Sequence, residues 1–257
     1  MARFLVFISI LLMGSSTYAQ DYTSPKRFSK WFVNDPVSFA RNLDSYDLLN
    51  FSAVAFNLSM LHGMDRPTSD LFQQRLKESP FLSITNVAGE RALLLPLSLG
   101  MFGTSLTGNN YKFQDAAFTS FQSLIYTTVM VNTTKFIASR ARPYEKEGVR
   151  DFDFFETNHT SFPSGHTASA FAYLTPWVVY YPGPLTYSLY IIPVGTALAR
   201  ISYGKHWFTD VGAGALIGTF WGYHLAKKHK METGQRGFSF TPVISSKAAI
   251  LNLSIKF

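Results

Sequence analysis

The chain has 257 residues, of which 47% are hydrophobic, and it carries a formal net charge of +7 at neutral pH. Its length and the lack of a Gly/Ser-rich linker predict one large domain, and the lack of an internal repeat excludes a solenoid. No basic cluster alternates with aromatic side chains, so we expect no nucleic acid partner. Because the sequence has no cysteine, disulfides, thiolate metal sites and cysteine nucleophiles are excluded.

The first residues are typical of a secretory signal. Arg3 supplies a positive charge, Phe4 to Met13 form an apolar core, and Thr17-Tyr18-Ala19 is a small-residue site that fits cleavage before Gln20. We therefore expect residues 1–19 to be removed as a signal peptide. An uncleaved anchor helix over the same residues is the alternative.

Apolar runs predict helices along the rest of the chain. A mildly apolar segment runs from Leu48 to Leu61, and stronger runs follow at Ala92–Leu106, Ala116–Val131, Thr167–Tyr181, Leu185–Ala199 and Val211–Ala226. Each strong run is shorter than the ~20 residues that a bilayer span requires. The runs are therefore either thin membrane spans or the buried helices of an all-helical core.

Charge at the end of the last run favours a membrane protein. Lys227, Lys228 and Lys230 follow this run directly, as the positive-inside rule expects of a cytoplasmic end. Five crossings that start outside the cytoplasm would also leave Lys227 inside. We expect an all-α bundle with about five or six transmembrane or core helices.

The C-terminal tail has a different pattern. Phe238 to Val243 and Leu251 to Phe257 alternate apolar and polar residues, which is the periodicity of β-strands. The remainder of the chain lacks the many alternating strands that an outer-membrane barrel requires. We therefore expect a short C-terminal β-hairpin.

The segment Phe162-Pro163-Ser164-Gly165-His166 precedes one of the apolar runs. Serine is a favoured N-cap, so a helix is expected to begin here. A helix N-terminus binds anions through its free N–H groups, and a glycine allows the backbone to approach a ligand closely. A histidine on the first turn adds a group that exchanges protons near neutral pH. The segment therefore predicts a phosphate-like ligand.

Two further clusters supply cations and a possible nucleophile. Lys135 and Arg142 are seven residues apart, so both are expected on one face of a helix that Pro143 ends. His206 and Asp210 are four residues apart, after Arg200. This spacing lets a carboxylate accept a hydrogen bond from one imidazole nitrogen and leaves the other free to attack.

All three clusters lie at ends of apolar runs. If the runs alternate in direction, the end of the second, the start of the third and the junction after the fourth meet on one side of the bundle. We therefore expect one pocket, on the face opposite Lys227, formed by Lys135, Arg142, Ser164, His166, Arg200, His206 and Asp210.

These residues resemble a known family. Lys-x6-Arg-Pro from Lys135, Pro-Ser-Gly-His from Pro163 and Arg-x5-His-x3-Asp from Arg200 are similar to the three-part signature of the type 2 phosphatidic acid phosphatase and vanadium haloperoxidase superfamily. The resemblance is close between Lys135 and Asp210 and loose in the flanking helices. Ala199 stands where the family usually has serine, which removes one possible hydrogen bond to phosphate.

The resemblance implies a role for each residue. His206 would be the nucleophile that forms a phosphohistidine, Asp210 would orient it, and His166 would protonate the leaving oxygen and then activate water. The cradle for the phosphoryl oxygens would consist of Lys135, Arg142, Ser164, Gly165 and Arg200. No metal or other cofactor is expected, because cations and a helix N-terminus can stabilise the transferring group. The rival interpretation, a metal site at the two histidines and the aspartate, is disfavoured by the neighbouring cations.

The resemblance also implies a metal-independent phosphatase acting on a phosphomonoester or pyrophosphate. A lipid substrate is favoured, such as lipid A, undecaprenyl pyrophosphate, phosphatidic acid or phosphatidylglycerophosphate. The alternatives are a soluble periplasmic non-specific acid phosphatase, a vanadium-dependent haloperoxidase and a non-catalytic phospholipid-binding protein. We expect a membrane location with the active site facing the periplasm; no oligomeric state is indicated.

The predicted organisation has four parts. They are the signal peptide (1–19), an N-terminal extracytoplasmic helical region (20–90), the phosphatase helical core (91–230) and the tail with its hairpin (231–257). The loop from Pro143 to Pro163 is acidic and is either a solvated loop or a gate over the cationic pocket. His159 in this loop is expected to be exposed, or to line the mouth of the pocket.

Overall fold

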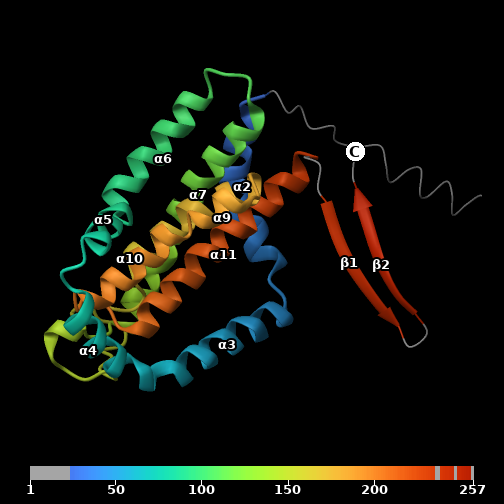
Figure 1. The fold of residues 1–257 in the computed structure, drawn as a ribbon. Coiled ribbons are helices and arrows are strands. Elements are labelled where there is room, and N and C mark those ends of the chain that lie inside the picture. Colours follow the sequence, from blue (N-terminus) through green and yellow to red (C-terminus); the bar gives the residue numbers. More distant parts are fainter. Residues whose placement is uncertain (1–23, 235–237, 246–247, 256–257) are drawn as a thin grey trace, which may run out of the picture.

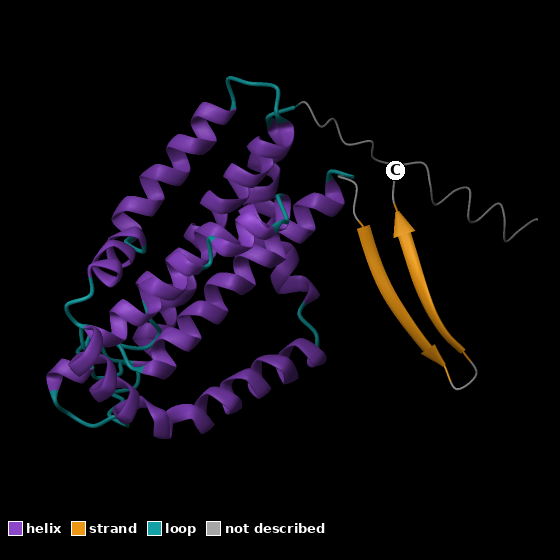
Figure 2. Ribbon diagram, in the orientation of Figure 1, coloured by secondary structure: helices purple, strands orange, loops and turns teal. Residues whose placement is uncertain are grey.

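A computed structural model describes residues 24–234, 238–245 and 248–255. The predicted signal peptide, residues 1–19, lies outside them. Helices fill the first of these ranges (Figure 2). The α-helices are α2 (Lys26–Asn42), α3 (Ser45–Met60), α4 (Asp65–Leu76), α5 (Pro80–Ala88), α6 (Arg91–Ser105), α7 (Tyr111–Ala138), α8 (Gly165–Tyr180), α9 (Pro184–Ser188), α10 (Ile191–Ser202) and α11 (Phe208–Glu232). Two 3₁₀ turns, η1 (Leu61–Met64) and η2 (Pro143–Glu145), lie between them.

The centre of the bundle is the close contact between α8 and α11. A Cβ atom on Gly214 would lie 2.5 Å from the carbonyl oxygen of Ser164, and one on Gly218 would lie 2.2 Å from that of Ala168. Both distances are far below van der Waals contact, so only glycine permits this approach. The two glycines are four residues apart and share one face of α11. This contact holds the start of α8 against the start of α11.

Helix α7 packs against α8 through small polar side chains. Ser120 Oγ donates a hydrogen bond to the carbonyl oxygen of Tyr173, and Ser123 Oγ donates one to that of Ala172. Both serines are fully buried. Small hydroxyl residues allow two helices to approach closely while their polar atoms stay hydrogen-bonded, which explains why this buried helix is not strongly apolar.

Helix α2 lies in the N-terminal region that was predicted to be helical (20–90), although residues 20–47 are mostly polar and contain no apolar run. Its apolar residues Phe28 and Trp31 are one turn apart and pack with Phe118 of α7. A narrow apolar stripe on an otherwise charged helix is sufficient when one aromatic cluster anchors it. The remaining face of α2 stays exposed to solvent.

The prediction of one continuous helix over Leu185–Ala199 is wrong, because the structure has two helices there. The chain forms the short helix α9, turns at Leu189 and Tyr190, and begins α10 at Ile191. Pro184 is the first residue of α9, and Pro193 stands in the first turn of α10. Proline suits the first turn of a helix, where no backbone N–H is required, but not a helix interior. The apolar run therefore contains two helix starts.

The sequence left open whether the apolar runs cross a membrane. Within the described residues, no helix combines the length and the apolar character that a bilayer crossing requires.

Two strands follow the helices near the C-terminus, in red in Figure 1. Strand β1 (Phe238–Ser245) pairs antiparallel with β2 (Ala248–Ile255), and Phe238 is opposite Ile255. The alternation in the sequence placed strands at 238–243 and 251–257. The last two residues of the second range lie outside the described residues.

Candidate active site

The predicted site residues meet at one end of the bundle, at the lower left of Figure 1, where α7 and α10 end and α8 and α11 begin. The backbone N–H of Ser164 donates a hydrogen bond of 2.9 Å to the carbonyl oxygen of Asp210. The charges of Arg142, Asp210 and Arg200 all act on Lys135. The structure thus brings together three clusters that lie far apart in the sequence.

Lys135 and Arg142 reach the site by a different route from the one predicted. Helix α7 ends at Ala138, and Ser139 then adopts a left-handed conformation with φ of 37°. Arg142 therefore lies beyond the helix, not on the same helical face as Lys135. Both side chains nevertheless donate hydrogen bonds to the carbonyl oxygen of Thr160. Burial, with a contribution from the charge of Arg142, lowers the pKa of Lys135 to about 7.

His206 is buried, with 2% of its surface exposed. Its Nδ1 lies 2.7 Å from the carbonyl oxygen of Ser161 and 3.7 Å from Oδ2 of Asp210. A carbonyl oxygen only accepts hydrogen bonds, so Nδ1 carries the proton and Nε2 keeps a free electron pair. Burial lowers the pKa of His206 to about 3. The ring is therefore neutral at physiological pH and suited to nucleophilic attack through Nε2.

Asp210 lies in the first turn of α11 and is fully buried. Its Oδ2 accepts hydrogen bonds from the hydroxyl of Ser161 and from the backbone N–H of Trp207. Its Oδ1 accepts one of 2.6 Å from Arg140. Burial by itself would raise the pKa of Asp210, but its contacts with His206, Arg140 and Ser161 hold the pKa below its usual value. Asp210 therefore stays ionised beside the imidazole of His206.

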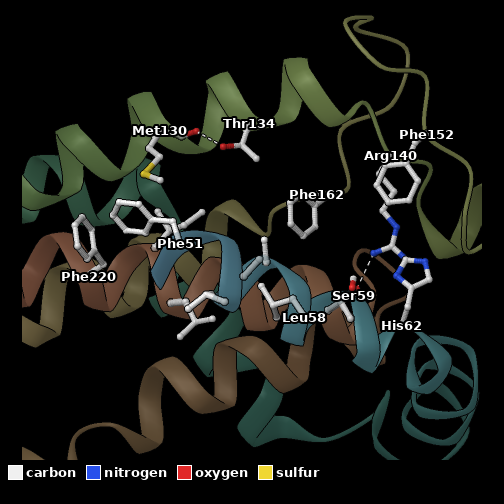
Figure 3. A pocket seen from close by; sticks show the side chains of 16 residues that line it. Phe51, Leu58, Ser59, His62, Met130, Thr134, Arg140, Phe152, Phe162 and Phe220 are labelled. Atoms are coloured by element: carbon white, nitrogen blue, oxygen red, sulfur yellow. Dashed lines mark hydrogen bonds between the residues drawn. The ribbon is translucent and has the colours of Figure 1, made fainter. Parts of the chain in front are cut away.

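Arg140 was not singled out from the sequence, although it stands inside the first cluster. Its guanidinium is fully buried between two carboxylates, 2.6 Å from Asp210 and 2.7 Å from Asp65. It also lies 3.3 Å from His62 Nε2, and Figure 3 shows these two side chains turned toward each other. His62 comes from η1, and Asp65 is the first residue of α4. No motif marks this segment, so its part in the site was missed.

The start of α8 has the predicted form. Ser164 is the N-cap residue and Gly165 the first helical residue. Arg91, at the start of α6, lies against Gly165, because one of its guanidinium nitrogens is 3.5 Å from the position of a Cβ there. His166 Nε2 lies 4.0 Å from a carboxylate oxygen of Glu90. Burial and the charges of Arg200 and Arg91 lower the pKa of His166 to about 4.

Glu90 and Arg91 also lie at the site, and neither was predicted from the sequence. Arg91 stands directly before the apolar run Ala92–Leu106, so its position at the end of a run was the available signal. The other cations of the site occupy equivalent positions.

Arg200 is the most buried of the unpaired cations, with 8% of its surface exposed. One of its terminal nitrogens donates to Asn86 Oδ1, and its Nε has no hydrogen-bond partner in the described part of the chain. Within that part, no carboxylate forms an ion pair with Arg200, Lys135, Arg142 or Arg91. Arg140, by contrast, is neutralised by two carboxylates. Buried positive charge without a partner favours an anionic ligand.

The acidic loop folds around His159. Its Nδ1 lies 3.0 Å from Glu145, and its Nε2 lies 3.2 Å from Glu147 and 3.4 Å from Asp153. His159 is 15% exposed, so it is held inside the loop and is not a freely exposed residue. Glu145 also accepts a hydrogen bond of 2.6 Å from the backbone N–H of Arg142. The loop is thereby tied to one of the cations of the site.

Three of these loop residues could approach a metal ion together. Ligand atoms of Glu145, Glu147 and His159 lie within 4.8 Å of one another. In the described part of the chain this is the group with such spacing, and it includes neither His166 nor His206. Exposed acidic groups of this kind are common without an ion.

An apolar cavity of about 490 Å³ lies beside the site, between α3, α7 and α11 (Figure 3). Three of its lining residues are neighbours of site residues: Thr134 precedes Lys135, Phe162 precedes Pro163 and Thr209 precedes Asp210. The rest of the lining is largely hydrocarbon, from Phe51, Val54, Leu58, Met130, Leu216 and Phe220. The cavity has the size and character of a site for a small apolar group.

Comparisons with known proteins identify similar proteins, and the family match includes the residues of the site. Residues 116–233 match the family model of the PAP2 superfamily. A segment of 92 residues is 37% identical to part of a lipid A 1-phosphatase of Porphyromonas gingivalis. The aligned segment covers 35% of this chain and 18% of that protein. The fold is similar to the crystal structure of LpxE from Aquifex aeolicus, with a TM-score of 0.50 and 24% identity, over 64% of this chain and 95% of that one.

Proposed function

Because residues 116–233 belong to the PAP2 superfamily, we propose that this chain is a phosphatase that removes a phosphomonoester or pyrophosphate group from a lipid. His206 is the nucleophile, His166 the general acid and base, and Asp210 the carboxylate that positions and stabilises His206. The observation that carries the proposal is the charge distribution. Lys135, Arg142 and Arg200 surround a neutral histidine and have no ion-pair partners among the described carboxylates.

The first step is transfer of the phosphoryl group to the enzyme. Nε2 of His206 attacks phosphorus, the bond from phosphorus to the lipid oxygen breaks, and His166 gives its proton to that oxygen. Charge on the three equatorial oxygens is stabilised by the cations and by the N–H groups at the start of α8. The products of this step are a phosphohistidine and the dephosphorylated lipid.

The substrate itself helps to protonate His166. In the empty site, burial and the neighbouring cations hold the pKa of His166 at about 4. A bound phosphate dianion adds negative charge next to the ring, which favours the protonated form. His166 is thus expected to gain its proton as the substrate binds.

The second step returns the enzyme to its starting state. His166, now neutral, takes a proton from water, the resulting oxygen nucleophile attacks phosphorus, and the bond to Nε2 of His206 breaks. Inorganic phosphate leaves, and one water has been consumed. The hydrogen bond from Nδ1 of His206 to Ser161 holds the ring in position through both steps.

Two observations support a lipid as the substrate. The cavity of about 490 Å³ beside the site is lined mainly by hydrocarbon. Helix α3, which forms one of its walls, buries none of its residues and exposes Leu48, Leu49, Phe56 and Met60. Exposed apolar surface of this kind marks a site of contact with a membrane or another apolar partner. The similarity of one segment to a lipid A 1-phosphatase agrees with this class of substrate. We propose that the site lies on the periplasmic side of a membrane.

The test is phosphate release by detergent-purified protein from lipid A, undecaprenyl pyrophosphate, phosphatidic acid, phosphatidylglycerophosphate and p-nitrophenyl phosphate, with and without chelator. We expect turnover of at least one lipid, unaffected by chelator. His206→Ala should abolish it, and His224→Ala, a change in α11 outside the site, should leave it intact.

Other results would replace the proposal. Hydrolysis of p-nitrophenyl phosphate alone indicates a non-specific acid phosphatase, and bromide oxidation with vanadate indicates a haloperoxidase. Lipid binding without turnover indicates a binding protein. Full activity in His206→Ala would remove the nucleophile assignment.

A further inference from the structure

Asp65 is a fully buried carboxylate that the proposed reaction does not use. Its Oδ1 accepts a hydrogen bond of 2.8 Å from the backbone N–H of Thr209, and its Oδ2 accepts one of 2.8 Å from the Thr209 hydroxyl. The same Oδ2 lies 2.7 Å from Arg140. Thr209 directly precedes Asp210. Asp65 therefore fixes the backbone of Thr209, next to Asp210. It also binds Arg140, which is a side-chain partner of Asp210.

Arg140 connects the two aspartates. One terminal nitrogen donates to Asp210 at 2.6 Å and to the hydroxyl of Thr209 at 2.8 Å. The other donates to Asp65 and to the carbonyl oxygen of Val149, each at 2.7 Å. A planar guanidinium with two occupied ends has a single orientation, which a lysine at this position could not reproduce.

The cluster has one positive and two negative charges. One guanidinium lies between two carboxylates, and all three groups are fully buried. Arg140 therefore divides its attraction between the two aspartates. If Asp65 lost its charge, Asp210 would be the one remaining carboxylate beside Arg140, and the guanidinium would attract it more strongly. Asp210 would then be moved, or its negative charge would be less available to His206.

Asp65 also comes from outside the region that matches the family, which begins at residue 116. It is the first residue of α4, at the junction with η1. The N-terminal helices therefore contribute to the organisation of the site through one short segment.

From this geometry we infer that Asp65 and Arg140 are positioning residues that hold Asp210 in place for His206, so that the rate of phosphoryl transfer depends on the N-terminal helices. The inference rests on the proposed phosphatase activity. Neither residue contacts the phosphoryl cradle of Lys135, Arg142 and Arg200 through a described hydrogen bond. Their effect should fall on kcat and not on KM.

The experiment compares Asp65→Asn with Asp35→Asn in the purified full chain. Asp35 is a matched control, because it is also buried and paired with cations, His229 and Lys228, in a cluster without His206 or Asp210. Thr209→Val is a milder second variant, which removes the hydroxyl between Arg140 and Asp65. Thermal unfolding is measured for each protein, and kinetics are measured well below the lowest melting temperature with the lipid that the wild type hydrolyses best.

We expect Asp65→Asn to lower kcat by about 10- to 100-fold, by analogy with the outer carboxylates that orient metal-binding histidines, with KM changed less than about 3-fold. Thr209→Val should lower kcat by a smaller factor, and Asp35→Asn should lower stability with kcat unchanged. The inference is overturned if Asp65→Asn and Thr209→Val keep wild-type kcat, if they raise KM alone, or if Asp35→Asn lowers kcat equally. A wild type without activity would instead contradict the proposed function.

Discussion

The proton of His206 is held by a backbone carbonyl and not by a carboxylate. Nδ1 of His206 lies 2.7 Å from the oxygen of Ser161, whereas Oδ2 of Asp210 is 3.7 Å away. In triads where the carboxylate selects the tautomer, replacing it by an amide lowers kcat by about 10⁴-fold, because the wrong nitrogen is protonated. Here the tautomer does not depend on Asp210.

We therefore expect Asp210→Asn to be less damaging than in such triads, with kcat lowered by about 10²- to 10³-fold and KM nearly unchanged. The loss reflects weaker stabilisation of the positive charge that develops on His206. Steady-state kinetics with the preferred lipid measure it, and His206→Ala sets the lower limit. A loss equal to that of His206→Ala would mean that Asp210 also selects the tautomer.

His166→Ala should slow the reaction most for substrates with poor leaving groups. A lipid alkoxide needs a proton as it departs, whereas p-nitrophenolate does not, so we expect a loss of about 10²-fold or more for the lipid and a much smaller one for p-nitrophenyl phosphate. Parallel assays of both substrates give the ratio. Equal losses would assign His166 to binding instead of proton transfer.

The dependence of kcat/KM on pH should report the ionisation of Lys135. Its pKa is lowered to about 7, so the side chain is a cation below this pH and becomes neutral above it. Because kcat/KM reports ionisation of the free enzyme, we expect it to fall above about pH 4 as His166 loses its proton, and more steeply above about pH 7 as Lys135 becomes neutral. Protonation of His206, with a pKa of about 3, should not limit kcat/KM until strongly acidic pH.

Lys135→Arg tests this assignment, because a guanidinium stays charged at every accessible pH. The steeper decrease above pH 7 should disappear in this variant, even if its maximum is lower. Persistence of the same decrease would assign the alkaline limb to another group.

Filling the apolar cavity should discriminate between lipid and small substrates. Ala55 of α3 lines the cavity, whereas Ala53 of the same helix is exposed and does not. Ala55→Trp is expected to raise KM for the lipid by about 10-fold and to leave hydrolysis of p-nitrophenyl phosphate unchanged, since an indole occupies space that a hydrocarbon chain would need. Ala53→Trp is the control for added apolar surface on α3. Similar effects of both variants would argue against a role for the cavity.

The sequence was informative where chemistry depends on residue type and spacing. Pro163 to His166 predicted a helix start, and the structure has Ser164 at the N-cap of α8. The expected convergence of three clusters is also found, because α7 and α10 end where α8 and α11 begin (Figure 1). The match to the PAP2 superfamily model, over residues 116–233, includes the same three clusters.

Tertiary contacts that leave no local pattern could not be predicted. Asp65 and Arg140 are 75 residues apart, and nothing near Asp65 distinguishes it from a solvated helix-start aspartate. The end of α7 was misplaced because a left-handed Ser139 is not a common helix terminus. The prediction relied on Pro143, which lies beyond the true end.

The contact of Gly214 and Gly218 with α8 divides the site into a fixed part and an adjustable part. The start of α11, which carries Asp210, and the start of α8 are in contact without an intervening side chain, so they cannot move closer together without steric overlap. Asn86, Glu90 and Arg91, in contrast, reach the same centre by side chains from α5 and α6. Substitutions that change which phosphate ester is accepted are therefore expected mainly in α5 and α6. The proposed reaction would stay the same.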